Sequence, residues 1–129
     1  SHSFARKLAV HEVTVAEWFV LREMFSESES TSPSKIAEIT GLTRGAISKL
    51  IDRLLQKGLV TRTESSADRR YQDIKLTARA LKLVPKLASV ADENDESFFA
   101  VLSKGDRKIL MEILTRLAEL HKLNASPIE

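Results

Sequence analysis

The sequence contains no cysteine. Disulfide bonds, thiolate catalysis, cysteine-based zinc sites and thiol redox sensors are therefore excluded. The absence of cysteine also fits a protein of the cytoplasm, where we expect this chain to act. No apolar run approaches the roughly 18 residues that span a membrane, and no signal peptide is visible. We therefore expect no membrane partner.

Residues that form turns and aromatic residues are scarce. Four Gly and three Pro are few for an all-β protein, and five Phe, one Tyr and one Trp predict a mainly aliphatic core. Stretches rich in Leu, Ala, Lys and Glu favour helix. A length of 129 residues, 43% of them hydrophobic and 29% charged, suits one globular domain. We expect a mainly α fold with a small β-hairpin.

Charge is unevenly distributed along the chain, although the net charge is only +2. Residues 43–79 hold nine basic and four acidic side chains, a net charge of +5. Residues 92–129 hold five basic and eight acidic side chains, a net charge of −3. A cationic middle segment beside an acidic tail indicates a surface for a polyanion, but chance variation of surface charge explains the split about as well.

Two short helices joined by a glycine turn are predicted near the middle of the chain. Ser32 followed by Pro33 is a helix start signal, and Gly41 ends the helix that they begin. Thr43 caps the next helix, whose buried stripe has i, i+3, i+4, i+7 spacing: Ile47, Leu50, Ile51 and Leu54. This order is typical of a helix-turn-helix, whose second helix enters the DNA major groove.

The flanking elements follow from the same patterns: helices over 4–11, 14–26, 77–101 and from Ser103 onward, and strands over 59–64 and 71–76. The two strands form a hairpin with a charged tip. Pro85 is expected to kink the long helix. The predicted architecture is therefore a winged helix-turn-helix domain with terminal helices.

The outer face of the second short helix carries the candidate DNA contacts. Its polar positions are Thr43, Arg44, Gly45, Ser48, Lys49, Asp52 and Arg53. Arg and Lys donate hydrogen bonds to guanine, and Ser and Thr contact base edges or phosphates. Gly45 would let the backbone approach DNA closely. The alternative is an ordinary solvated helix face.

The hairpin tip, Asp68-Arg69-Arg70, adds a second candidate contact. Arginine enters narrow, negative minor grooves, and an adjacent acid can fix its rotamer. The alternative is an exposed ion pair contributing about 0–1 kcal/mol. Its position directly after a helix-turn-helix favours the wing interpretation.

Three segments resemble the multiple antibiotic resistance regulator (MarR) family: "VAEWFVLREM", "LTRGAISKLIDRLLQKGLVTR" and "SSADRRYQDIKLT". The resemblance covers about residues 12–121. It implies base or phosphate contacts from Thr43, Arg44, Gly45, Ser48 and Lys49. It also implies that Arg70, together with Arg69, enters the minor groove with Asp68 as positioning partner.

The chain departs from the family pattern in three places. Ser48-Lys49 replaces the common Thr-Arg pair, residues 26–32 form a long Ser-rich loop, and the first helix is short. Lysine is a point donor and lacks the bidentate fork of arginine. Phosphate contact is therefore a firmer expectation for Lys49 than base recognition.

The resemblance further implies a homodimer whose first and last helices interlock. We expect one MarR-like domain over 1–129, with a DNA-binding part at 12–77 and dimerisation helices at 1–11 and 78–129. The predicted dimer residues are Leu8, Ile109, Ile113, Leu117 and Leu120. The alternative for this stripe is intramolecular core. A two-fold dimer would place its recognition helices about 34 Å apart.

Many family members are released from DNA by a small aromatic or anionic effector. Candidate effector contacts here are His11, Trp18 and Arg22, although Trp18 could simply be core and His11 a partly exposed polar residue. The three His show no metal-ligand spacing, and no nucleophile–base pair or Gly-rich phosphate loop occurs. We therefore expect no metal, no cofactor and no enzyme activity.

The sequence thus predicts a transcription regulator, a homodimeric repressor that binds a pseudo-palindromic operator and is released by a small molecule. The alternative is a winged-helix protein-interaction module without DNA binding. That alternative predicts neutral or acidic side chains on the outer helix face and on the wing. The sequence instead has basic side chains at these positions: Arg44, Lys49, Arg53, Arg69 and Arg70.

Overall fold

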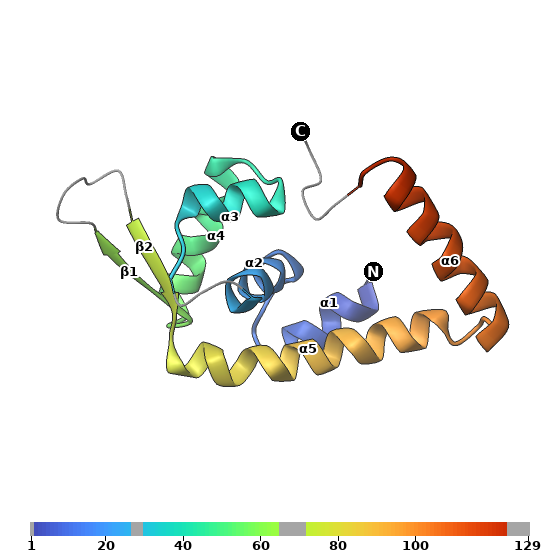
Figure 1. The fold of residues 1–129 in the computed structure, drawn as a ribbon. Helices are drawn as coiled ribbons and strands as arrows, with labels where there is room; N and C mark the ends of the chain where they lie inside the picture. The colour runs from blue at the N-terminus through green and yellow to red at the C-terminus, as the bar shows by residue number, and fades with distance from the viewer. Residues whose placement is uncertain (1, 27–29, 65–71, 124–129) are drawn as a thin grey trace.

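The computed structural model describes residues 2–26, 30–64 and 72–123. Its elements in chain order are α1 (His2–Ala9), α2 (Val15–Ser26), α3 (Pro33–Thr40), α4 (Arg44–Gln56), β1 (Val60–Glu64), β2 (Gln72–Leu76), α5 (Ala78–Phe99) and α6 (Lys104–Leu120). Figure 1 shows the hairpin at one end and α6 at the other. The expected mainly α fold with one hairpin is confirmed. In the described part of the chain, no helix has the length and apolar character that crossing a membrane requires.

Most helices begin where the sequence places a capping hydroxyl. In each case a Ser or Thr oxygen accepts a hydrogen bond from the backbone N–H three residues later, which satisfies a donor at the helix start. These caps are Ser32 to Lys35, Thr43 to Ala46, Thr77 to Ala80 and Ser103 to Asp106, at 3.0–3.2 Å. The short-range capping signals therefore fix the starts of α3, α4, α5 and α6.

The hairpin is tied to the helix-turn-helix at its base. β1 and β2 pair antiparallel, with Val60 opposite Leu76 and Glu64 opposite Gln72. Thr31, just before α3, adds a short bridge to Ile74, with N···O distances of 3.0 and 2.8 Å. These bonds hold the hairpin against the start of α3. The hairpin and the helix-turn-helix, the two predicted DNA-binding elements, are therefore joined directly.

The core lies between α2, α4, the hairpin and the first half of α5. It includes Trp18, Ile51 and Ile74, all at most 5% exposed. Leu8 of α1 is fully buried in the same core. α1 ends at Ala9, two residues earlier than expected, and α5 runs as one helix through Pro85.

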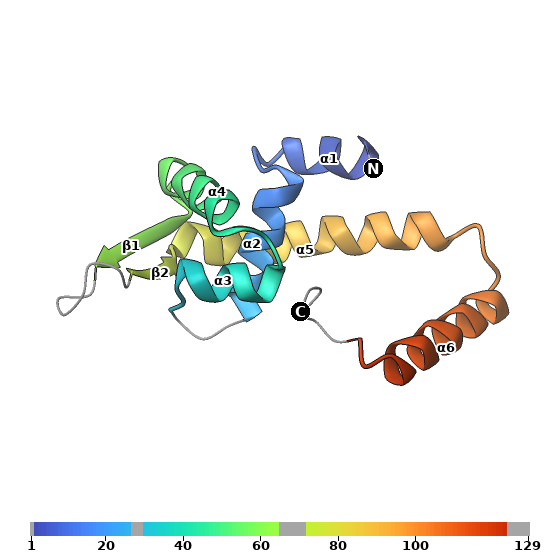
Figure 2. The ribbon, with the colours of Figure 1, turned by 90° about the horizontal axis from the view of Figure 1, so that it is seen from above.

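α5 extends well beyond the core, and α6 turns back from its far end (Figures 1 and 2). Arg107 fixes this corner by donating hydrogen bonds to Glu96 Oε1 at 2.9 Å and to the Phe99 carbonyl at 3.0 Å. No residue of α6 is buried. The C-terminal helix therefore has no core of its own within the described chain.

Candidate nucleic-acid interface

The turn between α3 and α4 is built from Gly41 and Thr40. Gly41 has a positive φ of 74°, and its N–H donates to the Ala37 carbonyl at 2.9 Å. The buried Thr40 hydroxyl donates to the Ile36 carbonyl at 2.7 Å and accepts from the Leu42 N–H at 3.3 Å. Sequence reasoning missed this role of Thr40, because threonine at a helix end gives no distinctive pattern.

α4 places its predicted contacts on one accessible face. Its buried side carries Ile47, Leu50, Ile51 and Leu54. All seven predicted polar positions are exposed: Thr43, Arg44, Gly45, Ser48, Lys49, Asp52 and Arg53. The Thr43 hydroxyl accepts from Ala46 N and keeps its hydrogen free to donate. Arg44 donates to the Ser34 hydroxyl, so its guanidinium links the starts of α3 and α4.

Gly45 has no packing role inside the chain. A Cβ added there would meet no atom within 4 Å. Glycine within a helix destabilises it by roughly 0.5–1 kcal/mol relative to alanine. A glycine that packing does not require, on the exposed first turn of α4, is consistent with close approach of an external molecule.

The substitution Gly45→Ala is expected to increase the stability of the fold and to weaken DNA binding. It should raise the free energy of unfolding by about 0.5–1 kcal/mol, because alanine favours helix. It should weaken binding to duplex DNA, because the new methyl group stands between the backbone and the groove. Urea unfolding and a DNA titration measure the two effects, with Ala46→Gly as the reverse control for stability. DNA affinity that rises with stability would contradict the close approach.

The base of the hairpin also contacts α4. Arg62 of β1 donates to Asp52 Oδ1 at 3.3 Å and to Gln72 Oε1 at 3.4 Å. Asp52 is therefore paired within the chain. Because Arg62 offsets the charge of its carboxylate, Asp52 would repel DNA less strongly than an unpaired acid at this position. The predicted wing residues Asp68, Arg69 and Arg70 lie outside the described residues.

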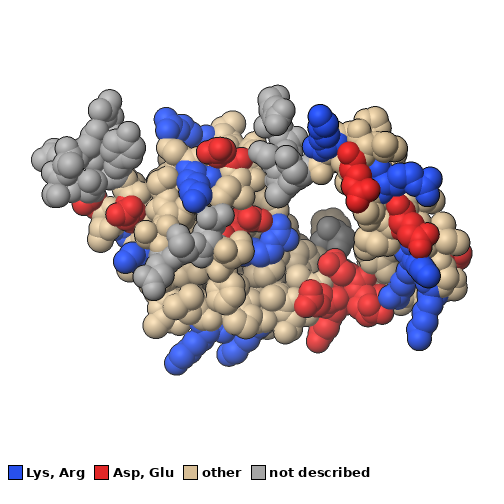
Figure 3. All heavy atoms as spheres, viewed as in Figure 1, with Lys and Arg blue, Asp and Glu red and all other residues tan. Residues whose placement is uncertain are grey.

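The densest group of acidic side chains lies away from this face. Figure 3 shows this group over the C-terminal part of α5, with acidic and basic side chains mixed on α6 and separate acidic side chains over the hairpin and the helix-turn-helix. The outer face of α4 itself carries Arg44, Lys49 and Arg53 against the single acid Asp52, so an approaching polyanion meets a net positive charge there.

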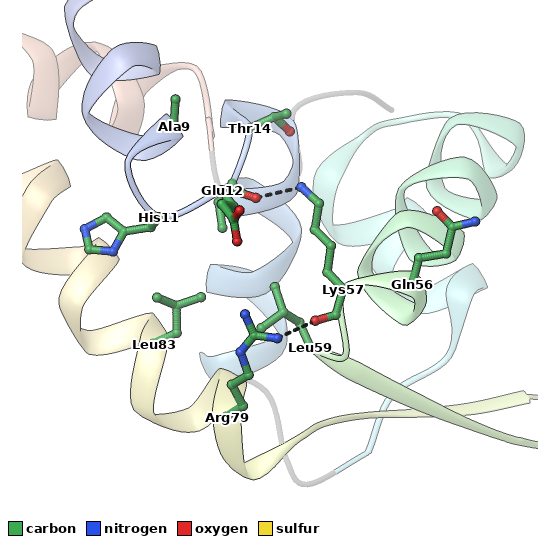
Figure 4. A pocket seen from close by; sticks show the side chains of 10 residues that line it. Ala9, His11, Glu12, Thr14, Gln56, Lys57, Leu59, Arg79 and Leu83 are labelled. Carbon is green, nitrogen blue, oxygen red and sulfur yellow. Dashed lines mark hydrogen bonds between the residues drawn. The ribbon is translucent and has the colours of Figure 1, made fainter.

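The C-terminal end of α4 is anchored by Lys57 (Figure 4). Its Nζ lies 2.9 Å from Glu17 Oε1 and 2.8 Å from Glu17 Oε2, and it donates to the Glu12 carbonyl at 2.7 Å. Arg79 of α5 donates to the Lys57 carbonyl at 2.8 Å. Lys57 therefore joins the end of α4 to the α1–α2 turn, to α2 and to α5.

Glu17 is fully buried and also caps α2. Its Oε1 accepts from Thr14 N at 3.0 Å, and its N–H donates to Thr14 Oγ1 at 3.1 Å, a reciprocal capping box. Burial raises the pKa of Glu17, but the hydrogen bonds from Lys57 and Thr14 outweigh it and hold the pKa below the ordinary value of 4.5. The carboxylate is therefore charged in the folded protein.

The structure does not bring the three predicted effector contacts together. His11 lines a hollow of about 610 Å³ between the α1–α2 turn, the end of α4 and the start of α5 (Figure 4). Trp18 is 5% exposed and belongs to the core. Arg22 stacks on Phe19, with its Cζ 4.9 Å from the ring centre. Neither Trp18 nor Arg22 lines this hollow, because both lie further along α2.

The predicted dimer stripe is exposed, with one exception. Ile109, Ile113, Leu117 and Leu120 are 44–72% exposed along α6. Leu8 is fully buried in its own chain, so it has no surface to offer a partner and is removed from the predicted interface. In the described ranges no group of three or more His, Asp or Glu is arranged to hold a metal ion.

Comparisons with known proteins agree with this geometry. The sequence profile of the MarR family matches residues 11–70. A protein of Thauera aromatica, named as a transcriptional regulatory protein for the hcr operon, is 26% identical over 114 residues, which are 88% of this chain and 69% of that protein.

Two solved structures share the fold. The Staphylococcus aureus MepR–DNA complex has a TM-score of 0.77 at 24% identity, covering 92% of this chain and 90% of that one. The organohalide-sensing regulator RdhR, in its 2,4-dichlorophenol-bound form, has a TM-score of 0.79 at 17% identity, covering 92% and 70%.

The fold and the exposed face of α4 define a winged helix-turn-helix protein. The comparisons confirm the resemblance to the MarR family: the family profile matches residues 11–70, and the Thauera relative is named as a transcriptional regulatory protein. Proteins of this group are regulators and not enzymes.

Proposed function

We propose that the chain is a homodimeric repressor that binds a pseudo-palindromic operator through α4 and the hairpin. The observation that carries this proposal is the exposed outer face of α4, where Arg44, Lys49 and Arg53 lie opposite the buried stripe of the same helix. The N-terminal turn of α4 enters the major groove, and Arg70 reaches the minor groove. DNA in the MepR neighbour supports this use of the fold.

The homodimer is supported by the exposed face of α6. Four large apolar side chains with i, i+4, i+8, i+11 spacing on one face of this helix are 44–72% exposed: Ile109, Ile113, Leu117 and Leu120. A contiguous apolar surface of this kind marks an interface. A second copy of the chain is the partner that would also place two copies of α4 along DNA, about 34 Å apart.

Residues 12–77 form the DNA-binding part of this proposal, and 1–11 with 78–129 form the dimerisation part of the single domain. The regulator acts in the cytoplasm, where its DNA lies. A small aromatic or anionic effector releases it, in keeping with the chlorophenol bound by the RdhR neighbour. The alternative of a winged-helix protein-interaction module is disfavoured by Lys49 and Arg53 of α4, which form no ion pair with any described residue, since a protein-binding face needs no such charge.

The proposal is tested by selecting bound sequences from random duplex DNA and titrating the selected site at several salt concentrations. The affinity should fall steeply with salt, because phosphate contacts release counterions. Arg70→Ala should weaken binding by about 1–3 kcal/mol without changing the oligomeric state. Lys108→Ala, on α6, is the matched control. Failure to bind any duplex at low salt would establish the interaction module instead.

A further inference from the structure

A side-chain hydrogen bond joins the two helices of the helix-turn-helix at their starts. Arg44, the first residue of α4, donates from its Nη2 to the Oγ of Ser34, the second residue of α3. Both residues are exposed, so core packing does not force them together. The guanidinium is therefore held at one place on the surface that carries the proposed DNA contacts.

The hydroxyl of Ser34 has no capping role in α3. Ser32 already caps this helix, accepting from the Lys35 N–H at 3.2 Å. Serine favours helix less than alanine does, so an exposed Ser34 does not strengthen α3. An exposed hydrogen bond also adds little to the free energy of folding, because water would replace it. What the bond from Arg44 to Ser34 does change is the freedom of the Arg44 side chain.

Restricting Arg44 before DNA binds has a consequence for recognition. A long side chain loses rotamer entropy when it is fixed on a ligand, and less is lost if the side chain is already held. One of the five guanidinium N–H groups is used on Ser34, which leaves four. Two neighbouring N–H groups of an arginine match O6 and N7 of guanine, a pairing that depends on their orientation. Ser34 thus prepares the arginine for such a contact.

Arg44 has the best position on α4 to contact a base. The N-terminal residues of a recognition helix are the ones that reach base edges. A Cβ added to the neighbouring Gly45 would meet no atom of the described chain within 4 Å, so the space beside Arg44 is open. Lys49 lies about 7.5 Å further along the helix and has no fork of donors, and Arg53 lies about 13.5 Å further. Within α4, all of which the structure describes, Arg44 is the one arginine at the N-terminal end.

We propose that Ser34 is a positioning residue for Arg44, and that Arg44 recognises one guanine in each half of the operator. Arg44 donates to O6 and N7 of that base, while Ser34 keeps the guanidinium from turning away. Lys49 contacts phosphate and adds affinity that is independent of sequence. The inference rests on the proposed function, because it requires α4 to enter the major groove.

The first part of the test locates the guanine. Sequences are selected from random duplex DNA with the wild type and with Arg44→Ala, and the position whose guanine preference depends on Arg44 is identified. The selected site is then titrated with guanine, adenine or 7-deazaguanine at that position. The wild type should bind the guanine site roughly 5- to 150-fold more tightly than the adenine site, and Arg44→Ala should lose this ratio. 7-Deazaguanine, which lacks the N7 acceptor, should weaken binding of the wild type but not of Arg44→Ala.

The second part of the test addresses Ser34. Ser34→Ala should lower the guanine-to-adenine ratio about three- to fivefold, the effect of losing one net hydrogen bond. The salt dependence should remain that of the wild type, because no phosphate contact is lost. Ser34→Thr keeps a hydroxyl and should restore the ratio. The matched control is Ser89→Ala, which removes an exposed hydroxyl of α5 that donates to the Pro85 carbonyl at 3.2 Å and should change neither quantity.

Three results would overturn the inference while DNA binding itself is intact. An unchanged ratio in Ser34→Ala would show that Ser34 does not position Arg44. Equal weakening of all three sites by Ser34→Ala, with a smaller salt dependence, would make Ser34 a phosphate contact. Selection of the same guanines by Arg44→Ala would show that Arg44 recognises no base. A wild type that binds no duplex would instead overturn the proposed function, and this inference with it.

Discussion

Lys57→Met is expected to lower the free energy of unfolding by about 3 kcal/mol, because it leaves the buried Glu17 carboxylate without its partner. For a chain of this length the melting temperature should fall by roughly 10 °C. Chemical and thermal unfolding measure both values. Lys49→Met, which removes an exposed cation from the same helix, should change stability little.

The pH dependence identifies Glu17 as the cause. In the wild type its pKa is lowered on folding, so its contribution is fully present above about pH 4.5 and is lost as the pH falls through the lower pKa of the folded state. In Lys57→Met, burial without the partner raises the pKa of Glu17. Its contribution is then present at low pH and lost as the pH rises. A destabilisation independent of pH would contradict this explanation.

A double-mutant cycle separates the pair from simple loss of packing. Glu17→Gln/Lys57→Met should be more stable than Lys57→Met alone, because glutamine keeps an oxygen to accept from Thr14 and carries no charge. If the double variant loses the sum of the two single effects, the two side chains act independently and the anchor is not an ion pair.

Ile113→Glu/Leu117→Glu is expected to convert the proposed homodimer into a monomer. Two carboxylates would face two symmetry-related carboxylates across an apolar interface, where each loses its hydration. Operator affinity should then fall by about 10²–10⁴, since two linked half-sites bind with an effective concentration that one half-site lacks. Light scattering and a DNA titration measure the two changes.

The folded chain itself should be unaffected by this substitution, because both side chains are about 45% exposed. Circular dichroism should match the wild type. Val15→Glu, at an apolar position of α2 that is 42% exposed, is the matched control and should remain dimeric. A double variant that is still dimeric would show that the partner covers another surface.

Local patterns in the sequence were sufficient to predict the helix-turn-helix. A capping hydroxyl acts over three residues and an apolar stripe over one helix, so Thr43 and the stripe from Ile47 to Leu54 could be identified without tertiary structure. Exposure of the opposite face then follows from helical geometry.

Contacts between distant segments could not be predicted in this way. Glu17 and Lys57 are 40 residues apart, and no local pattern pairs them. Leu8 has the same helical spacing whether it packs in its own chain or in a partner. The sequence leaves Trp18 open as either core or effector contact, because local spacing does not determine which face of α2 packs into the core.

Because Lys57 anchors the C-terminal end of α4, a rotation of this helix would pivot about that end. The helix is about 18 Å long, and its other end bears the groups that face DNA. A rotation of about 10° at the pivot would displace the first turn by about 3 Å, enough to break a hydrogen bond to a base. Small rearrangements around Glu17 and Arg79 are thus magnified where the protein meets DNA, without touching any residue there.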